Sequence, residues 1–296
     1  MSDYPIQKKN DYTSKKFAIV RRLGCPNCGI FSFFIVNLGC VNYYLSLGYI
    51  PIIDLQTFPN MYNGGNISIY NPWELYFYQA YNYTFKEVKK YSTNITYFNC
   101  TANIYRPNVY NIYYDNNTLT FWHNFALKYM PLKIEITKEA EIKMKEFFGA
   151  SKNILGVLAR GTDYISLKPK KHPIPPKVEQ VISDTKAMDE LNRYDFIFFS
   201  TEDEIIKQKF KKSFDYKLKM LNPNIILQYD YTKNKKSINL NEKIYGNLEY
   251  VKNYILNIII LSKCLDIITA KCSGAVGLFI LSNGFRYTKI YNLGVY

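Results

Sequence analysis

The feature that most constrains the fold is a regular alternation of short apolar runs and longer amphipathic segments over residues 153–291. The expected strands are Asn153–Ala159, Phe196–Ser200, Asn224–Tyr229, Leu265–Ala270 and Phe285–Tyr291. The expected helices between them are Pro175–Leu191, Glu202–Phe214, Leu248–Ser262 and Gly274–Ser282. Strands that alternate with helices over such a length predict a parallel, doubly wound sheet.

The first half of the chain carries the same rhythm less regularly. A strand is expected at Phe17–Arg21, a helix at Phe31–Leu47 and a buried strand at Tyr49–Leu55, and the turn-rich sequence GCPNCG joins the first two. This order describes a β-α-β unit. The region that follows is irregular, with aromatic-rich helices expected at Trp73–Ala80 and Phe85–Tyr91.

A charged, strongly helical segment at Ile136–Phe148 is suited to connect the two halves. We place the domain boundary near Gly149–Lys152, so that residues 1–150 and 151–296 form two domains. A chain of 296 residues is long enough for two medium domains with real cores.

The formal net charge of +14 favours an anionic partner, such as a phosphorylated small molecule, a membrane surface or nucleic acid. A lysine-rich solvated surface explains most of this charge. No secretory signal opens the chain, and the apolar stretches Phe31–Ile53 and Tyr254–Ile268 are broken by polar residues. We therefore expect a cytoplasmic protein, and peripheral contact with the inner face of the membrane through the positive charge stays open.

The motif Cys25-Pro-Asn-Cys28 has the spacing of a redox dithiol or of half a zinc site. A zinc site needs a second pair of ligands, and neither His123 nor His172 stands at ligand spacing from another Cys or His. We interpret the motif as two loop cysteines that happen to be close, and we expect no bound metal. In a reducing compartment disulfides are not expected.

Polar motifs follow three of the expected strands. They are Arg160-Gly-Thr-Asp163, Ser200-Thr-Glu-Asp203 and Lys271-Cys-Ser-Gly274. Because ligands of open parallel sheets bind beyond the carboxyl ends of the strands, the three motifs should converge on one edge. A guanidinium at this edge can hold a phosphate through two hydrogen bonds.

Each motif also has a structural interpretation. Thr201 and Glu204 fit a helix-capping box, and Ser273 fits a simple helix cap. Arg160 could form an ion pair with Asp163, Glu202 or Asp203. No dinucleotide-binding glycine motif, Walker A sequence, Asp-x-Asp pair or hydrolase nucleophile elbow occurs in the chain.

Taken together, the motifs resemble the signature of the core α1,6-fucosyltransferases and the bacterial nodulation fucosyltransferases. In that family an Arg-Thr-Asp motif ends a strand and a His-Pro-Ile follows, as Arg160-Gly-Thr-Asp163 and His172-Pro-Ile174 do here, nine positions after the aspartate. Ser200–Asp203 is similar to the family's second acidic strand end, and Ile255–Ser273 to its helix-strand-Ser segment. Segments of the first half are similar to bacterial surface-polysaccharide relatives, namely Gly29–Ser32, Tyr49–Asp54 and Asn71–Glu74.

The resemblance implies an α/β fold of the GT-B-like kind, with two Rossmann-like domains facing a central cleft. The first domain would bind the acceptor and the second the nucleotide sugar. It implies inverting, metal-independent transfer of L-fucose from GDP-fucose, or of another sugar from its GDP-sugar, to a glycan or lipid-linked glycan acceptor in bacterial surface polysaccharide synthesis. It implies no cofactor and no nucleic-acid partner.

The resemblance also assigns residues. Arg160 takes the place of the catalytic arginine on the β-phosphate, Ser273 that of a serine near the diphosphate, and Asn257 that of an aspartate for guanine. The full set expected at the donor is Arg160, Gly161, Thr162, Lys168, His172, Thr201, Glu202, Asp203, Asn257, Cys272, Ser273 and Gly274.

The chain departs from the family at three positions. The motif's histidine is Leu158, its second arginine is Gly161, and its acidic base falls on Lys168. A lysine replaces a carboxylate base only if burial lowers its pKa by several units. We therefore name Asp163 and Glu74 as catalytic candidates beside Arg160, with Asp54 as a further guess for the base.

Two other functions are compatible with the sequence. The missing residues could leave a sugar-nucleotide-binding protein without turnover. The positive charge and the many tyrosines could instead serve nucleic acid, although no recognisable nucleic-acid-binding module is present.

Overall fold

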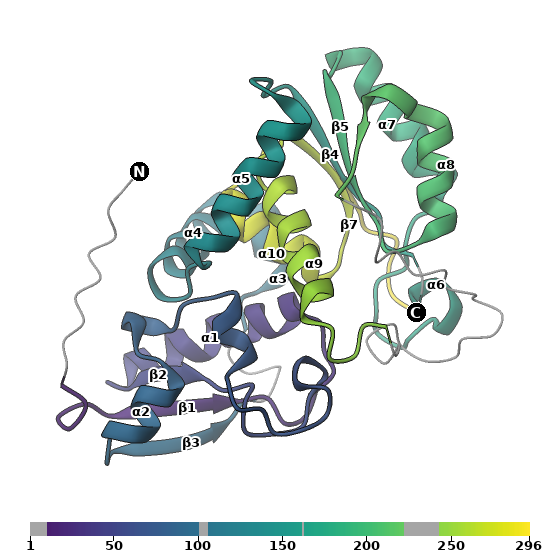
Figure 1. Cartoon of the computed structure of the whole chain (residues 1–296). Coiled ribbons are helices and arrows are strands. Elements are labelled where there is room, and N and C mark those ends of the chain that lie inside the picture. The colour runs from purple at the N-terminus through teal and green to yellow at the C-terminus, as the bar shows by residue number, and fades with distance from the viewer. Residues whose placement is uncertain (1–10, 101–105, 162, 222–242) are drawn as a thin grey trace. The chain divides into compact units, whose positions relative to one another are not determined.

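The computed structural model describes residues 11–100, 106–161, 163–221 and 243–296. The chain divides into two compact units (Figure 1). Unit 1 comprises Met1–Ile136 and Tyr245–Leu248, and unit 2 comprises Thr137–Ile244 and Glu249–Tyr296. We describe each unit in turn.

Unit 1 is built on a three-stranded parallel sheet with the order β2-β1-β3. Strand β1 (Phe17–Arg21) pairs on one side with β2 (Ile50–Ile53) and on the other with β3 (Ile95–Asn99). Helix α1 (Ile30–Ser46) connects β1 to β2. The predicted β-α-β unit is therefore confirmed.

The rest of unit 1 consists of short helices. They are η1 (Met61–Asn63), η2 (Pro72–Leu75), η3 (Ala80–Asn82), α2 (Phe85–Tyr91), α3 (Val109–Tyr114) and α4 (Asn116–Tyr129). The predicted helix Phe85–Tyr91 is confirmed, whereas the predicted helix Trp73–Ala80 is wrong, because the chain makes only the short turn η2 there. Trp73 and Phe77 are fully buried and stacked at 4.4 Å, so their spacing reflects packing in the core.

Two disulfides correct the expectation of reduced cysteines. Cys25 is bonded to Cys28, and Cys40 in α1 is bonded to Cys100, the residue after β3. The second pair is separated by 60 residues in sequence. Because β3 lies beside β1 in the sheet, its end reaches the helix that follows β1, and sequence spacing gives no sign of this proximity.

Unit 2 contains a five-stranded sheet in which every pair is parallel. The strands are β4 (Ile154–Leu158), β5 (Phe196–Ser200), β6 (Leu218–Lys219), β7 (Asp266–Ala270) and β8 (Tyr287–Tyr291). Their order is β6-β5-β4-β7-β8, which is 3-2-1-4-5 when counted within the unit. This is the order of a Rossmann-like doubly wound sheet, and it reverses between β4 and β7.

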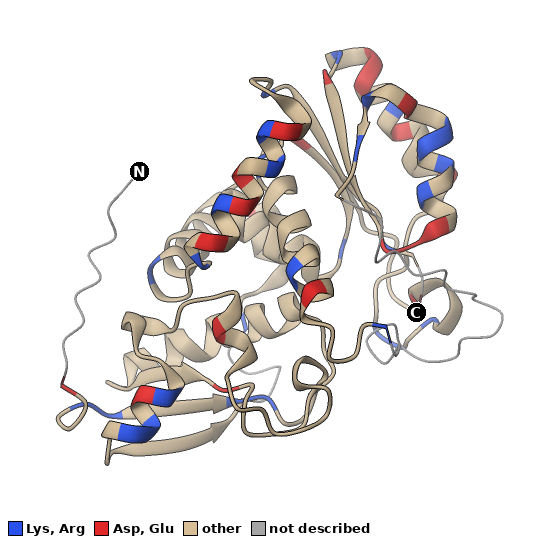
Figure 2. Ribbon diagram, viewed as in Figure 1, with Lys and Arg blue, Asp and Glu red and all other residues tan. Residues whose placement is uncertain are grey.

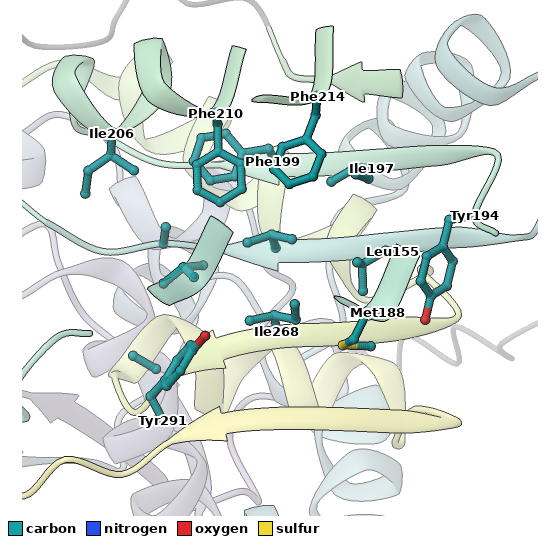
Figure 3. Close-up of a cluster of buried hydrophobic side chains, with 14 residues drawn as sticks. Leu155, Met188, Tyr194, Ile197, Phe199, Ile206, Phe210, Phe214, Ile268 and Tyr291 are labelled. Carbon is teal, nitrogen blue, oxygen red and sulfur yellow. The ribbon is translucent and has the colours of Figure 1, made fainter. Parts of the chain in front are cut away.

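The helices of unit 2 cover both faces of this sheet (Figure 1). They are α5 (Ile134–Phe148), α6 (Asp163–Leu167), α7 (Val178–Asn192), α8 (Glu204–Phe214), α9 (Leu248–Leu261) and α10 (Ser273–Ser282), with the turn η4 (Asp215–Lys217) after α8. On the face covered by α7 and α8, Phe199 stacks on Phe210 at 3.9 Å within a buried apolar cluster (Figure 3). On the other face, Phe148 of α5 packs edge-on against Phe198.

The predicted alternation is confirmed for four of the five strands and all four helices, within a few residues at each end. The predicted strand Asn224–Tyr229 lies outside the described residues. The predicted connector forms α5, although its helix begins two residues earlier, at Ile134.

Much of the charge on the helices of unit 2 is paired. Acidic and basic residues alternate along α5 (Figure 2), and Lys143 lies 2.8 Å from Glu146 there. Lys209 of α8 similarly contacts Glu179 of α7 at 2.6 Å. Among the described helices, none combines the length and the apolar character needed to cross a membrane.

Candidate functional site

The three polar motifs that were predicted at strand ends lie at the carboxyl edge of the sheet in unit 2. Here the backbone N–H of Ala159, just after β4, donates to the carbonyl of Ser200 at the end of β5. Lys271 follows β7, and α10 begins two residues later. These strand ends flank the point where the strand order reverses, which is where open α/β sheets bind their ligands.

Arg160 lies at the centre of this edge. Its side chain is 20% exposed, and its guanidinium contacts Asp163 at 3.2 Å and Glu202 at 3.5 Å. It also lies over the ring of Tyr164, 4.1 Å from the centroid. The ion pairs that the sequence allowed as a structural interpretation are thus present for two of the three acids.

The guanidinium still has unused donor capacity. Its Nε is buried without a hydrogen-bond partner among the described residues. Burial lowers the pKa of Arg160, but the charges of Glu202 and Asp163 more than offset this and raise the pKa further. Arg160 is therefore a fixed cation, with an inward N–H group that the described chain does not satisfy.

Gly161 is closely packed against the start of α8. A Cβ at this position would overlap the carboxylate of Asp203 and lie 2.7 Å from Cδ1 of Ile206. Asp203 caps α8 by accepting from the backbone N–H groups of Ile205 and Ile206. The capping box predicted for Thr201 and Glu204 is therefore wrong, because the cap lies two residues later than Thr201.

The start of α10 has a similar arrangement. Cys272 is the helix cap, and its Sγ accepts from the N–H of Ala275 at 3.3 Å, so the cap is not Ser273. Ser273 is exposed, whereas a Cβ on Gly274 would overlap the hydroxyl of Tyr254. Burial raises the pKa of Cys272, although the nearby charge of Arg160 acts in the opposite direction. The raised pKa keeps the thiol protonated.

A small cavity of about 60 Å³ opens beside these residues. The loop after β5 supplies Thr201 and Glu202, and one face of α9 supplies Tyr250, Asn253, Tyr254 and Asn257. The amide nitrogen of Asn257 donates to the carbonyl of Asn253 at 2.8 Å. Burial raises the pKa of both tyrosines, so their hydroxyls stay neutral donors.

Sequence reasoning named Asn257 from this helix but missed its neighbours in the cavity. The usable signal was the spacing of 250, 253, 254 and 257, which places polar side chains on one face of a helix that is otherwise apolar.

The loop after α6, which carries Lys168, Lys170 and Lys171, does not line the cavity. Lys168 is exposed with a left-handed backbone (φ 45°) just after the helix ends. His172 is exposed, and its ring lies edge-on to Tyr164 at 5.3 Å, so it reaches Arg160 only through that ring. Backbone pairing of Pro173 with Val295 holds the loop. Thr162 lies outside the described residues.

The two candidate bases in unit 1 are held by their own surroundings. Oε1 of Glu74 accepts from the N–H of Phe85 at 2.7 Å and from Gln79 at 3.0 Å, and burial raises its pKa. Asp54 is fully buried and accepts from Arg21 at 2.9 Å and from two backbone N–H groups. No group of three or more His, Cys, Asp or Glu side chains suited to a metal ion occurs within the described part of the chain.

The comparisons with known proteins agree with this geometry at the level of the fold. The NodZ alpha-1,6-fucosyltransferase soaked with GDP-fucose is 12% identical, with a TM-score of 0.51 over 90% of this chain and 92% of that one. The fucosyltransferase NodZ from Bradyrhizobium gives the same identity and TM-score, over 89% and 92%. POFUT1 in complex with GDP is 8% identical, with a TM-score of 0.53 over 94% and 99%.

This chain has the fold of those fucosyltransferases. The α/β fold class that the motifs implied is thereby confirmed. No protein-family model matches the sequence, and no curated protein matches it. At these identities the likeness extends to the fold alone, so the activity has to be argued from the site.

Proposed function

We propose that this protein is a glycosyltransferase that moves a sugar, L-fucose in our assignment, from its GDP-sugar to a glycan acceptor with inversion at the anomeric carbon. The observation that carries the proposal is Arg160, a largely buried cation at the switch point of a Rossmann-like sheet, whose buried Nε–H has no partner among the described residues. Solved structures with this fold contain GDP or GDP-fucose, which is the kind of ligand such a cation suits.

The chemistry requires a stabilised leaving group. When the acceptor oxygen attacks the anomeric carbon, the bond from that carbon to the β-phosphate oxygen breaks and negative charge accumulates on the departing diphosphate. A preorganised guanidinium stabilises such charge at the moment it develops. Ser273 and Gly274 stay in the donor set because they begin α10, where the positive end of the helix dipole favours the same anion.

One edge of the base would face the small cavity between the loop after β5 and α9. Amide and phenol groups line it, and such groups hydrogen-bond the edges of a base. Because the nitrogen of Asn257 is engaged by Asn253, its oxygen is the atom we assign to the base. Thr201 and Glu202 line the same cavity and complete the set of residues that we assign to the nucleoside. Lys168 and His172 would influence donor binding only through the loop after α6.

The proton of the acceptor hydroxyl has two candidate receivers. Asp163 lies beside Arg160, and one of its carboxylate oxygens is already engaged in that ion pair. Glu74 has a raised pKa and uses one carboxylate oxygen for both of its hydrogen bonds, which suits a general base better. We keep both residues as catalytic candidates and give Glu74 the preference.

The cellular compartment is the part of the proposal that differs most from the expectation drawn from the sequence. The similarity of the first half to surface-polysaccharide relatives supports a role in building a glycan. The buried Cys40–Cys100 disulfide favours an oxidising compartment over the cytoplasm that the sequence suggested. A peripheral membrane contact through exposed lysines, a lipid-linked acceptor and turnover without a metal remain predictions.

Replacement of Arg160 tests the proposal. We expect Arg160→Ala to lower kcat for fucose transfer by about 100- to 1,000-fold, the usual effect of removing one donor to developing charge. Arg160→Lys keeps the positive charge beside the two acids but loses the two-pronged grip, so it should fold and still be strongly impaired. The control is Lys209→Ala, which removes an exposed cation paired with Glu179 in the same unit and should keep turnover within a few-fold.

The readouts are product formation from GDP-fucose and circular dichroism of each variant. Near-wild-type turnover by Arg160→Ala would refute the assignment. A thermal-shift panel of GDP, GDP-fucose, GDP-mannose, UDP-sugars and an oligonucleotide separates the alternatives. A GDP-specific shift without turnover would indicate a binding protein, and a salt-sensitive shift with the oligonucleotide alone would indicate a nucleic-acid partner.

A further inference from the structure

The two disulfides of unit 1 differ in their surroundings. Cys40 and Cys100 are buried, with 0% and 3% of their surface exposed. Cys25 and Cys28 are both partly exposed in the loop after β1. A reductant in solution can therefore reach the Cys25–Cys28 bond without opening the core. Accessible disulfides are the ones that exchange readily.

The loop also places Cys28 where its thiolate would be stabilised. Only Gly29 separates it from α1, a helix of 17 residues, and Gly29 provides no side-chain cap for the helix. The amino end of a helix carries partial positive charge, which lowers the pKa of a thiol close to it. Its position before the helix therefore makes Cys28 the better leaving group of the pair.

We propose that Cys25–Cys28 is a thiol–disulfide exchange site whose partner is a dithiol reductant. A thiolate of the reductant attacks Sγ of Cys25, the Cys25–Cys28 bond breaks, and its electron pair leaves on Sγ of Cys28. The second thiol of the reductant, once deprotonated, then displaces Cys25. The two protons released by the reductant end on Cys25 and Cys28, so the protein gains two electrons and the reductant becomes a disulfide.

The surrounding contacts confine the consequence to this loop. The carbonyl of Cys28 accepts from the hydroxyl of Tyr62 at 2.6 Å, and the carbonyl of Pro26 accepts from the N–H of Met61 at 3.4 Å. Opening the bond frees the two cysteines while the Cys40–Cys100 bond still ties α1 to the end of β3. Exchange at this site is thus reversible within a folded unit, and it does not depend on the proposed glycosyl transfer.

The test uses the full chain, with the buried pair as an internal control. The protein is equilibrated with dithiothreitol at graded ratios of reduced to oxidised form, quenched, alkylated and analysed by peptide mass spectrometry. We expect Cys25 and Cys28 to be half-labelled at a ratio at least about tenfold lower than the one that labels Cys40 and Cys100. Return to oxidised dithiothreitol should restore the bond.

Two variants refine the test. With Cys28→Ser, Cys25 should form a persistent mixed disulfide with glutathione, seen as a glutathione adduct on that peptide. With Cys25→Ser and Cys28→Ser together, the circular dichroism spectrum should match the wild type. The proposal is overturned if the two pairs are reduced only together, if Cys25 and Cys28 stay as thiols in oxidising buffer, or if the double variant unfolds.

Discussion

The carboxyl edges of the two sheets carry the same pair of groups and use them differently. In unit 1, Arg21 ends β1 and contacts Asp54 at 2.9 Å. In unit 2, Arg160 follows β4 and contacts Asp163 and Glu202 at 3.2 and 3.5 Å. A strand-end arginine beside an acid is therefore not in itself the mark of a site.

The difference lies in how far the chain itself satisfies each group. Asp54 accepts from Arg21, from the N–H groups of Gln56 and Thr57 and from the Thr57 hydroxyl, and the Arg21 guanidinium stacks over Tyr97 at 4.2 Å. Those contacts all lie within unit 1, and Arg21 has no buried N–H without a partner among the described residues. Arg160 instead keeps a buried Nε without a partner among the described residues, next to a cavity. A buried Nε without a partner is not sufficient either, because Arg22, directly after β1, has one among the described residues as well. We assign the ligand to the edge of unit 2 because Arg160 there combines such a donor with a contact to Glu202, which lines a polar cavity.

Asp54→Ala, which removes the acid of the structural pair in unit 1, should have the largest effect on stability. It leaves a guanidinium and several N–H groups without their acceptor, and removing one partner of a buried ion pair costs about 3–5 kcal/mol. The free energy of unfolding from denaturant titration measures this loss. The matched change Asp54→Asn retains part of the hydrogen bonding and should cost less. Equal midpoints for Asp54→Ala and the wild type would show that the ion pair is not structural.

The position of Arg160 was predictable because two simple patterns meet there. The apolar run ending at Leu158 marks a buried strand, and in parallel sheets the residues after a strand face the ligand edge. The same reasoning brought Glu202 and Gly274 to this edge. Local periodicity was sufficient for these residues because each lies within a few positions of an element that the sequence defines well.

Contacts between distant segments were not predictable in this way. The Cys40–Cys100 bond depends on β3 lying beside β1, and the close packing at Gly161 depends on the approach of α8. The tyrosines of α9 were missed because an aromatic-rich chain offers many similar residues. The predicted helix caps were wrong for a simpler reason. Several side chains near each helix start are able to cap it, and in the structure the caps are Asp203 and Cys272.

Gly161→Ala should sharpen the other side of the comparison with an intermediate effect. The added methyl group meets Asp203 and Ile206, and overpacking of this kind costs about 1–3 kcal/mol. We also expect weaker GDP binding in calorimetry, because the added methyl group would displace Asp203 at the edge that carries Arg160. The control is Gly24→Ala, where a Cβ meets nothing within 4 Å and the change in unfolding free energy should stay within about 0.5 kcal/mol. Equal effects of the two substitutions would contradict close packing at Gly161.

Glu74→Gln should have the smallest effect on stability and gives the most specific test. Burial is the main influence on the pKa of this carboxyl group in unit 1. Burial raises its pKa above the ordinary value of 4.5, so the folded state favours the protonated form. The resulting stabilisation is complete below pH 4.5 and is lost as the pH rises through the raised pKa. Relative to Glu74→Gln, which cannot ionise, the wild type should lose unfolding free energy across that window and then show a constant difference. Denaturant titrations of both proteins at a series of pH values measure this, and a difference that grows in favour of the wild type would mean that hydrogen bonds from Phe85 and Gln79 outweigh burial.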